Sequence, residues 1–250
     1  MSIYDKPVRL LFKDMIKALD AKPGELITRE QVFSWFRNNY PKIKDGTIAA
    51  HLLKMSTNAS SRVHYNVSLA GDDDLLYQID SQRFRLYTPD ADPPPIYEKE
   101  KEAGREDVEE EIEPAVEVGE FAYEKDLQNF LAKNLFLVEP GLHLYEEEEI
   151  TGIEFPVGNR RIDILAVDEN SDYVVIELKV SRGYDRVIGQ LLRYMAWIKK
   201  YQADPEQKVR GMIIAREISE DLLLACSQLD NIDLYEYELS VSLHPMGLPG

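Results

Sequence analysis

Two segments rich in Val and Ile, separated by a short polar stretch, constrain the fold of this chain most. They are residues 160–168 (Arg-Arg-Ile-Asp-Ile-Leu-Ala-Val-Asp) and residues 173–180 (Tyr-Val-Val-Ile-Glu-Leu-Lys-Val). β-Branched and aromatic residues favour strands, and the polar residues between the segments favour a turn, so the sequence predicts a β-hairpin. A hairpin with an odd loop centred on Asn170 sets residue 163 directly opposite residue 177.

This register brings two carboxylates, those of Asp163 and Glu177, across from each other. Like charges in that position are unfavourable unless a cation lies between them. Side chains alternate along a strand, so Lys179 shares the face of Glu177. Two acids and a lysine on one face suit a divalent-metal site for phosphodiester hydrolysis. Glu-x-Lys alone is common on solvated strands, but the apolar residues 174–176 indicate burial, where unpaired charge is costly.

The resemblance to a known family extends over four sequence blocks that occur in one order. They are Arg-Ile-Asp-Ile-Leu-Ala from residue 161, Val-Ile-Glu-Leu-Lys from 175, Gly-Gln-Leu-Leu-Arg-Tyr-Met-Ala-Trp from 189 and Val-Arg-Gly-Met-Ile-Ile-Ala from 209. Together they resemble the nuclease domain of the NucS/EndoMS family, within the PD-(D/E)xK restriction-endonuclease-like superfamily. Residues 124–134 resemble the opening helix of that family. Ile162 stands where the superfamily name has Pro.

The resemblance implies five catalytic residues: Glu124, Asp163, Glu177, Lys179 and Gln190. Asp163 and Glu177, with the carbonyl of Leu178, would coordinate one or two Mg²⁺ or Mn²⁺ ions. Glu124 would hold a second metal or its water shell. Lys179 would position or activate the attacking water, or stabilise the pentavalent intermediate, and Gln190 would orient the water or the scissile phosphate.

The second half of the chain carries the element order of a restriction-endonuclease-like fold, α-β-β-β-α-β, in the α/β (α+β) class. We expect helices over residues 121–135, 185–201 and 219–229, a strand near 142–150, the hairpin over 160–180, and strands over 209–215 and 232–237. The resemblance covers roughly residues 120–240. Residues 1 to about 90 do not resemble the NucS N-terminal domain, so recognition could lie in a different module.

The first half predicts three helices followed by strands, an order typical of a winged helix-turn-helix domain. The first helix covers residues 8–19. The second opens with a capping box at Thr28 and ends at Pro41, and the third covers residues 45–55 with Asp45 as its N-cap. Strands are expected around 63–69 and 75–87. The third helix of such a domain usually enters the major groove. Its candidate DNA contacts are Lys44, Thr47, His51, Lys54 and Arg62, although many winged helices bind protein instead.

Charge divides the chain into three parts. Residues 1–87 hold 13 Lys/Arg and 10 Asp/Glu (+3), residues 88–119 hold 3 and 12 (−9), and residues 120–250 hold 13 and 24 (−11), which adds up to −17. We therefore expect a winged-helix-like DNA-binding domain (1–87), a Pro-rich acidic linker (88–119) and a nuclease domain (120–250). Nonspecific DNA binding normally depends on basic surface, so the first domain is the better candidate for holding DNA.

Composition excludes several other classes. The single Cys226 allows no intrachain disulfide and no Cys-based metal cluster. The chain opens without an apolar signal region, and no run approaches eighteen apolar residues, so we expect a cytoplasmic protein without a membrane span.

The sequence thus predicts a Mg²⁺- or Mn²⁺-dependent endodeoxyribonuclease that cuts double-stranded DNA as a homodimer. Its context would be DNA repair, or restriction and phage defence, with the winged-helix module as the targeting element. Two alternatives stay open. One is a DNA-binding regulator with a catalytically inactive nuclease fold, and the other is a protein-interaction scaffold, which the net acidity favours.

Overall fold

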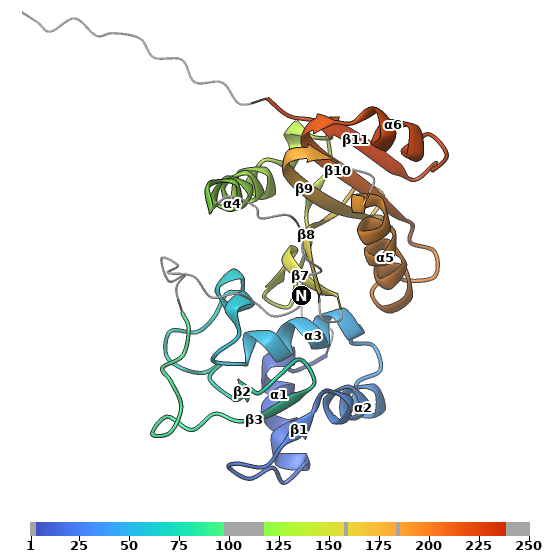
Figure 1. Ribbon diagram of the computed structural model, residues 1–250. Coiled ribbons are helices and arrows are strands. Elements are labelled where there is room, and N and C mark those ends of the chain that lie inside the picture. Colours follow the sequence, from blue (N-terminus) through green and yellow to red (C-terminus); the bar gives the residue numbers. More distant parts are fainter. Residues whose placement is uncertain (1–3, 98–117, 158–159, 184–185, 239–250) are drawn as a thin grey trace, which may run out of the picture.

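Two α+β domains pack directly against each other in the computed structural model, which describes residues 4–97, 118–157, 160–183 and 186–238 (Figure 1). The N-terminal domain has its own apolar core of residues from three helices and a small sheet. The C-terminal domain has one larger sheet with helices on both faces. The separate domains and the mixed helix-and-sheet class agree with the sequence-based expectation.

The N-terminal domain contains α1 Val8–Ala18, β1 Ile27–Thr28, α2 Arg29–Asn39, α3 Asp45–Lys54, the 3₁₀ helix η1 Ser60–His64, β2 Leu76–Gln78 and β3 Arg83–Leu86. β3 pairs antiparallel with both β1 and β2. The predicted capping box opens α2: the backbone N–H of Gln31 donates to Oγ1 of Thr28 (3.2 Å), and that of Thr28 donates to Oε1 of Gln31 (2.7 Å).

Three details of this domain differ from the prediction. The strand expected over 63–69 is absent, because η1 and irregular chain occupy the region. The strand expected over 75–87 is instead the β2–β3 hairpin, turned where the Asp80 carboxylate accepts the backbone N–H groups of Gln82 and Arg83 (2.9 and 2.8 Å). Lys44 occupies the N-cap position of α3, and Asp45 forms an ion pair with Arg37 (2.6 Å).

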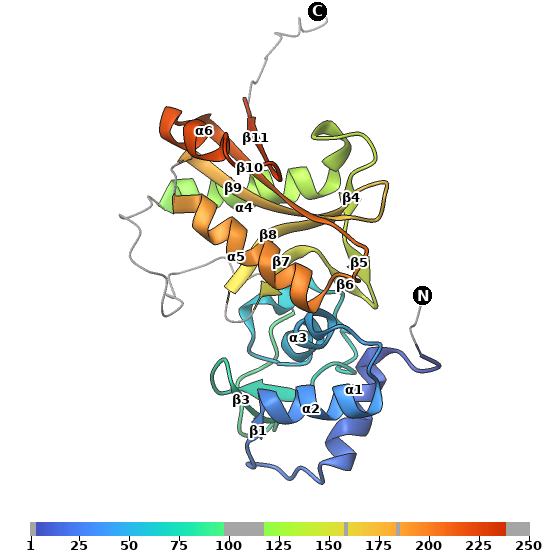
Figure 2. The same cartoon turned by 90° about the vertical axis from the view of Figure 1, so that its right-hand side faces the viewer.

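The C-terminal domain contains α4 Val118–Lys133, η2 Leu135–Leu137, β4 His143–Leu144, β5 Glu146–Glu147, β6 Ile150–Thr151, β7 Ile153–Val157, β8 Arg160–Val167, β9 Tyr173–Gly183, α5 Arg186–Tyr201, β10 Val209–Ile218, α6 Glu220–Cys226 and β11 Ile232–Glu236. The sheet order is β11-β10-β9-β8, with β4 and β7 both pairing along the outer edge of β8. α4 covers one face, and α5 and α6 cover the other (Figure 2).

The region before β8 departs most from the prediction. The single strand expected near 142–150 is divided into three short strands, and a turn at Glu148 and Glu149, which have φ of +50° and +69°, separates β5 from β6. β7 was not predicted. It contains Pro156, which lacks a backbone N–H and is tolerated because β7 is an edge strand.

The two domains share an apolar cluster, so their interface is part of the protein core. Ala50 of α3 and Tyr65 join the core between the sheet and α5. Gly46 of α3 lies so close to the C-terminal domain that an added Cβ would be 2.2 Å from Oε1 of Gln202 and 3.0 Å from Cζ of Phe155. A side chain at this position would force Gln202 to shift, and the close contact lies where α3 meets β7 and α5 (Figure 1).

The chain after β3 stays attached to the N-terminal domain. Residues 88–97 have no helix or strand, as their proline content predicts. The backbone N–H of Ile96 donates to the carbonyl of Thr57 (2.8 Å), and Asp92 forms an ion pair with Arg85. The acidic stretch that was expected to be loosely ordered, residues 98–117, lies outside the described residues.

A membrane-crossing helix is absent from the part of the chain that the structure describes, since none there combines sufficient length with sufficient apolarity.

Replacing Gly152 with Ala should destabilise the protein strongly. The residue links β6 to β7, and an added Cβ would lie 2.0 Å from the backbone carbonyl oxygen of Leu165, which cannot move without breaking the sheet. We expect a loss of about 1–3 kcal/mol or more in urea unfolding. Gly189→Ala is the matched control, because no atom lies within 4 Å of its added Cβ. Gly189 is in helix α5, so this change should stabilise by about 0.5–1 kcal/mol. Equal effects of the two changes would contradict the close approach at Gly152.

Candidate active site

The β8–β9 hairpin has the register that the sequence predicts. Ile164 pairs with Ile176 and Val167 with Tyr173, which centres the loop on Asn170. Oδ1 of Asp168 accepts the N–H groups of Asn170 and Asp172 (2.9 and 3.0 Å) and closes this loop. Extending the ladder by one residue would set Asp163 opposite Glu177, which is the placement that the sequence predicts.

Regular backbone pairing between β8 and β9 ends at the acid pair. Oδ2 of Asp163 accepts the backbone N–H of Leu178 (2.7 Å), so a side chain takes the place of the next ladder bond. Burial raises the pKa of the Asp163 carboxyl well above its usual range, and the charges of Glu177 and Glu124 raise it further. Asp163 thus holds its proton to a higher pH than an ordinary carboxyl.

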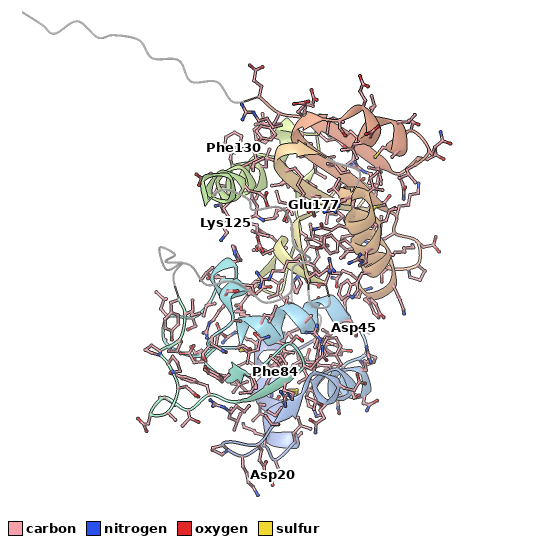
Figure 3. The ribbon with its side chains drawn as sticks, in the orientation of Figure 1. Asp20, Asp45, Phe84, Lys125, Phe130 and Glu177 are labelled. Atoms are coloured by element: carbon pink, nitrogen blue, oxygen red, sulfur yellow. The ribbon has the colours of Figure 1, made fainter. Side chains whose placement is uncertain are left out.

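Glu177 lies in the interior of the sheet, between β8 and β10, with 1% of its surface exposed. Figure 3 shows it between α4 and α5. Its Oε1 accepts hydrogen bonds from Nε2 of Gln190 (2.8 Å) and Nζ of Lys179 (3.2 Å). Nε2 of Gln190 also donates to the hydroxyl of Tyr194 (3.2 Å). These partners make the burial of a charged carboxylate tolerable.

Lys179 is a fixed cation beside the two acids. Burial disfavours its ammonium form, but the charges of Glu177, Asp163 and Glu124 outweigh burial, so the pKa of Lys179 lies above its ordinary value. The ammonium therefore persists at neutral pH. The charge of Glu124, a half-buried residue of α4, raises the pKa of both Asp163 and Lys179. Of the five residues that the resemblance implied, hydrogen bonds join Glu177, Lys179 and Gln190, and Asp163 contacts the same strand at Leu178.

The donor set fits a hard divalent cation in part. Asp163 and Glu177 supply carboxylate oxygens, the charge of Glu177 raises the pKa of Asp163, and an added cation would relieve this repulsion. Among the described residues, however, no group of three or more His, Cys, Asp or Glu side chains is close enough to hold a metal. A cation here would complete its shell with backbone carbonyl, water or substrate oxygens, as Mg²⁺ commonly does.

One buried polar residue at the site was missed by the sequence analysis. Gln128 of α4 is 3% exposed, and its Nε2 donates to the backbone carbonyl of Asp163 (2.8 Å) and to Oε1 of Glu154 (3.1 Å). A glutamine on a helix usually faces solvent. The signal that could have found it is its spacing, since Glu124 and Gln128 at i and i+4 share one helix face.

The expectation that α3 and its neighbours contact DNA is wrong for this structure. Four of the five candidate contacts are fully buried: Thr47, His51, Lys54 and Arg62. Lys44 forms an ion pair with Asp204 of the C-terminal domain. Burial lowers the pKa of His51 to about 4, so its ring is neutral.

The acidic β5–β6 hairpin covers this face of the N-terminal domain. Oε2 of Glu147 accepts the hydroxyl of Thr47 (2.7 Å), and Oε2 of Glu149 pairs with Nζ of Lys54 (2.5 Å). The polar side chains of α3 do bind a partner, but that partner is a segment about a hundred residues later in the same chain. The sequence of α3 alone cannot show this.

Comparisons with known proteins separate the two halves. Residues 7–86 match the family described as Domain of unknown function (DUF7669), and residues 123–236 match the Endonuclease NucS C-terminal domain. Endonuclease NucS of Sulfolobus acidocaldarius is 29% identical over 118 residues, which is 46% of this chain and 43% of that protein. The protein of the same name from Methanopyrus kandleri is 26% identical over 100 residues, which is 40% of this chain and 35% of that protein. The chain thus matches less than half the length of these relatives.

Two solved structures show a low overall similarity. A repair endonuclease from Pyrococcus abyssi has a TM-score of 0.36 at 21% identity, over 54% of this chain and 50% of that one. An EndoMS–dsDNA complex has a TM-score of 0.40 at 22% identity, over 55% and 51%. By the family matches, residues 123–236 resemble the NucS C-terminal domain, and residues 7–86 form a separate domain.

Lys54→Met should weaken the domain interface without changing DNA affinity. The change leaves the buried Asp73 (3.8 Å from Nζ of Lys54) without its cation and removes the nearer of the two cations beside Glu149. Removing one partner of a buried ion pair typically costs about 3–5 kcal/mol, measured here by urea unfolding. Lys44→Met is the control, since its pair with Asp204 is exposed and should contribute under about 1 kcal/mol. Little loss of stability, with a lower salt dependence of DNA binding, would restore the groove-reading role of α3.

Asp163→Asn should stabilise the metal-free protein at neutral pH. The folded protein holds the Asp163 proton at pH values where the unfolded chain has lost it, so ionised Asp163 lowers stability as pH rises above about 4. The amide removes this loss while its oxygen can still accept the N–H of Leu178. In EDTA we expect a rise in Tm of about 2–4 °C at pH 7, for a gain of about 1 kcal/mol. The difference should shrink toward pH 4. Asp168→Asn, at the other end of β8, should give no rise.

Proposed function

We propose that this protein is a divalent-metal-dependent endonuclease that hydrolyses phosphodiester bonds in double-stranded DNA. The observation that carries the proposal is the contact of Asp163 with β9, where its carboxylate accepts the backbone N–H of Leu178 between Glu177 and Lys179. The match of residues 123–236 to the NucS C-terminal domain, and the relatives named Endonuclease NucS, support the same reaction class.

The side chains divide the chemistry among them. Asp163, Glu177, the carbonyl of Leu178 and, more distantly, Glu124 would hold Mg²⁺ or Mn²⁺. The bound cation would supply an acidified water and offset the charge that develops on the phosphate. Lys179 stabilises that negative charge as an ammonium, because its raised pKa makes it a poor base while both acids are ionised.

Gln190 is the orienting residue in this scheme. Its Nε2 is held by Oε1 of Glu177 and the hydroxyl of Tyr194, which fixes the side chain on α5. These two hydrogen bonds also fix the direction of the carbonyl oxygen of the same side-chain amide. It would accept a hydrogen bond from the attacking water, and the fixed rotamer would lower the entropy lost on reaching the transition state.

Targeting by the N-terminal domain must use surface other than α3. The groove-reading face of that helix is occupied by the C-terminal domain, so a DNA contact would require exposed residues such as Arg37 and Arg83, whose side chains are 49% and 53% exposed.

We further propose that two chains act together as a homodimer, since one such site serves one strand and a duplex has two. Light scattering during gel filtration tests this, and a monomer at working concentration would contradict it. A role in DNA repair, or in restriction and defence, follows from the duplex substrate.

Lys179→Met should abolish cleavage while leaving folding and DNA binding nearly unchanged. One catalytic group contributes roughly 10²-fold or more in rate, and the methionine keeps the buried stem of the side chain. The assay uses plasmid DNA and mismatched, branched and methylated duplexes, with Mg²⁺, Mn²⁺ or EDTA. Lys133→Met, at the exposed end of α4, is the control.

Two results would contradict this assignment. Retention of more than about a tenth of wild-type activity by Lys179→Met would remove Lys179 from the reaction. A wild-type protein that binds DNA but cuts none of these substrates with either metal would instead be a regulator with an inactive nuclease fold. Absence of DNA binding as well would favour a protein-interaction scaffold.

A further inference from the structure

Asp163 has a second acidic neighbour on the side opposite Glu177. β7 pairs with β8 through Ile153 with Ile164 and Phe155 with Ile162, which sets Glu154 opposite Asp163. In a regular strand the two carboxylates would lie side by side and repel each other. Glu154 instead has φ of +51°, which interrupts the ladder at this position. A non-glycine residue in this conformation costs about 1–3 kcal/mol, and such residues cluster at functional sites.

A buried amide joins these two residues to helix α4. Nε2 of Gln128 donates to the carbonyl oxygen of Asp163 (2.8 Å) and to Oε1 of Glu154 (3.1 Å). One side chain therefore fixes the distance between α4, β7 and β8 at the level of the acid pair. Since Glu124 lies one turn earlier on the same helix face, the amide also sets where Glu124 stands relative to Asp163.

Arg161 extends this set of polar contacts to the N-terminal domain. Its Nη1 lies 3.6 Å from Oε2 of Glu154, and its Nη2 donates to Oγ of Ser60 in η1 (3.3 Å). Tyr65, just after η1, is buried at the same place, and the charges of Arg161 and Glu154 both act on its hydroxyl. A continuous series of contacts thus runs from the backbone of Asp163 to the neighbouring domain.

We infer that Gln128 and Glu154 are positioning residues for Asp163, and that through Arg161 and Ser60 they make its alignment depend on the docked N-terminal domain. The inference rests on the proposed function, because alignment of Asp163 matters only if it holds the cation. It gives the domain of residues 4–97 a role besides nucleic-acid recognition: that domain completes the support of the neighbouring active site.

Substitution of Gln128 tests the first part. Gln128→Met keeps the length of the side chain and removes both hydrogen bonds. We expect kcat to fall by about 10–100-fold and half-maximal activity to need more Mg²⁺, as is typical when a residue that orients a metal ligand is lost. KM for DNA should stay within about two-fold, because Gln128 does not reach the substrate. Asn129→Met, the next residue of α4, is the matched control and should change neither.

Substitution of Glu154 separates positioning from simple packing. Glu154→Gln keeps an oxygen acceptor for the Gln128 amide and should retain most of kcat, whereas Glu154→Ala should lower it as Gln128→Met does. The double variant with Gln128→Met and Glu154→Ala should be no slower than the slower single variant, since residues that act as a unit are not additive. Additive losses would overturn the shared role.

Amide hydrogen exchange at Leu178 provides a readout that does not require activity. Its N–H donates to Oδ2 of Asp163, so it reports whether that carboxylate is in place. Gln128→Met should speed exchange of this amide by about ten-fold, while amides of the sheet centre such as that of Val175 keep their protection. If Gln128→Met speeds exchange of the Leu178 amide but the wild-type protein cleaves no DNA, the proposed nuclease function is wrong and the positioning role of Gln128 stands. An active wild-type protein with unchanged kcat and exchange in Gln128→Met would overturn the inference.

Ser60→Ala tests the link between the domains. The residue lies outside the active site, yet the change should speed Leu178 exchange and lower kcat by about 2–10-fold, because it removes one exposed hydrogen bond from the Arg161 guanidinium. Ser34→Ala is the control, since this half-buried serine of α2 donates to Glu30 of the same helix (3.1 Å). No change at Leu178 in Ser60→Ala would overturn the dependence on the N-terminal domain.

Discussion

The end of the β8–β9 ladder is the constraint on which the site depends. Up to Ile164 and Ile176 the two strands are held by backbone pairing, and immediately beyond it the Asp163 carboxylate takes the N–H of Leu178. This places a charged group where the backbone would otherwise continue, with Glu177 beside it. Burial and like charge make the arrangement unfavourable by itself. Lys179, Gln190 and the amide of Gln128 are the groups that make it tolerable.

The domain interface accounts for much of the uneven charge. The N-terminal part carries +3 and the C-terminal part −11, which by itself suggests an N-terminal surface that attracts DNA. The structure shows that part of this complementarity is satisfied inside the chain. Lys44 and Lys54 pair with acids of the C-terminal domain, and Arg9 lies 3.9 Å from Glu149. Formal charge of a segment therefore does not measure the charge it offers to a partner.

Local patterns predicted the elements and the register, and failed where distant segments meet. Alternation of apolar residues and an odd loop were enough to predict the register of β8 and β9, because strand geometry is periodic. The capping box at Thr28 was equally local. By contrast, the burial of Lys54 depends on Glu149, and the role of Gln128 depends on the backbone of Asp163. β7 was missed because Pro156 and Glu154 break the pattern that marks a strand.

The close seating of Gly46 and Ala50 on the C-terminal domain has a consequence for chain connectivity. The two halves meet through a shared apolar cluster and through the pair of buried Lys54 with Glu149, so we expect their association not to depend on the peptide link between residues 97 and 118. A protease that cut there would leave two fragments that remain together as a noncovalent complex. The same surfaces would allow the halves to be produced as separate chains and to find each other after synthesis, so the covalent junction sets their stoichiometry and the interface sets their geometry.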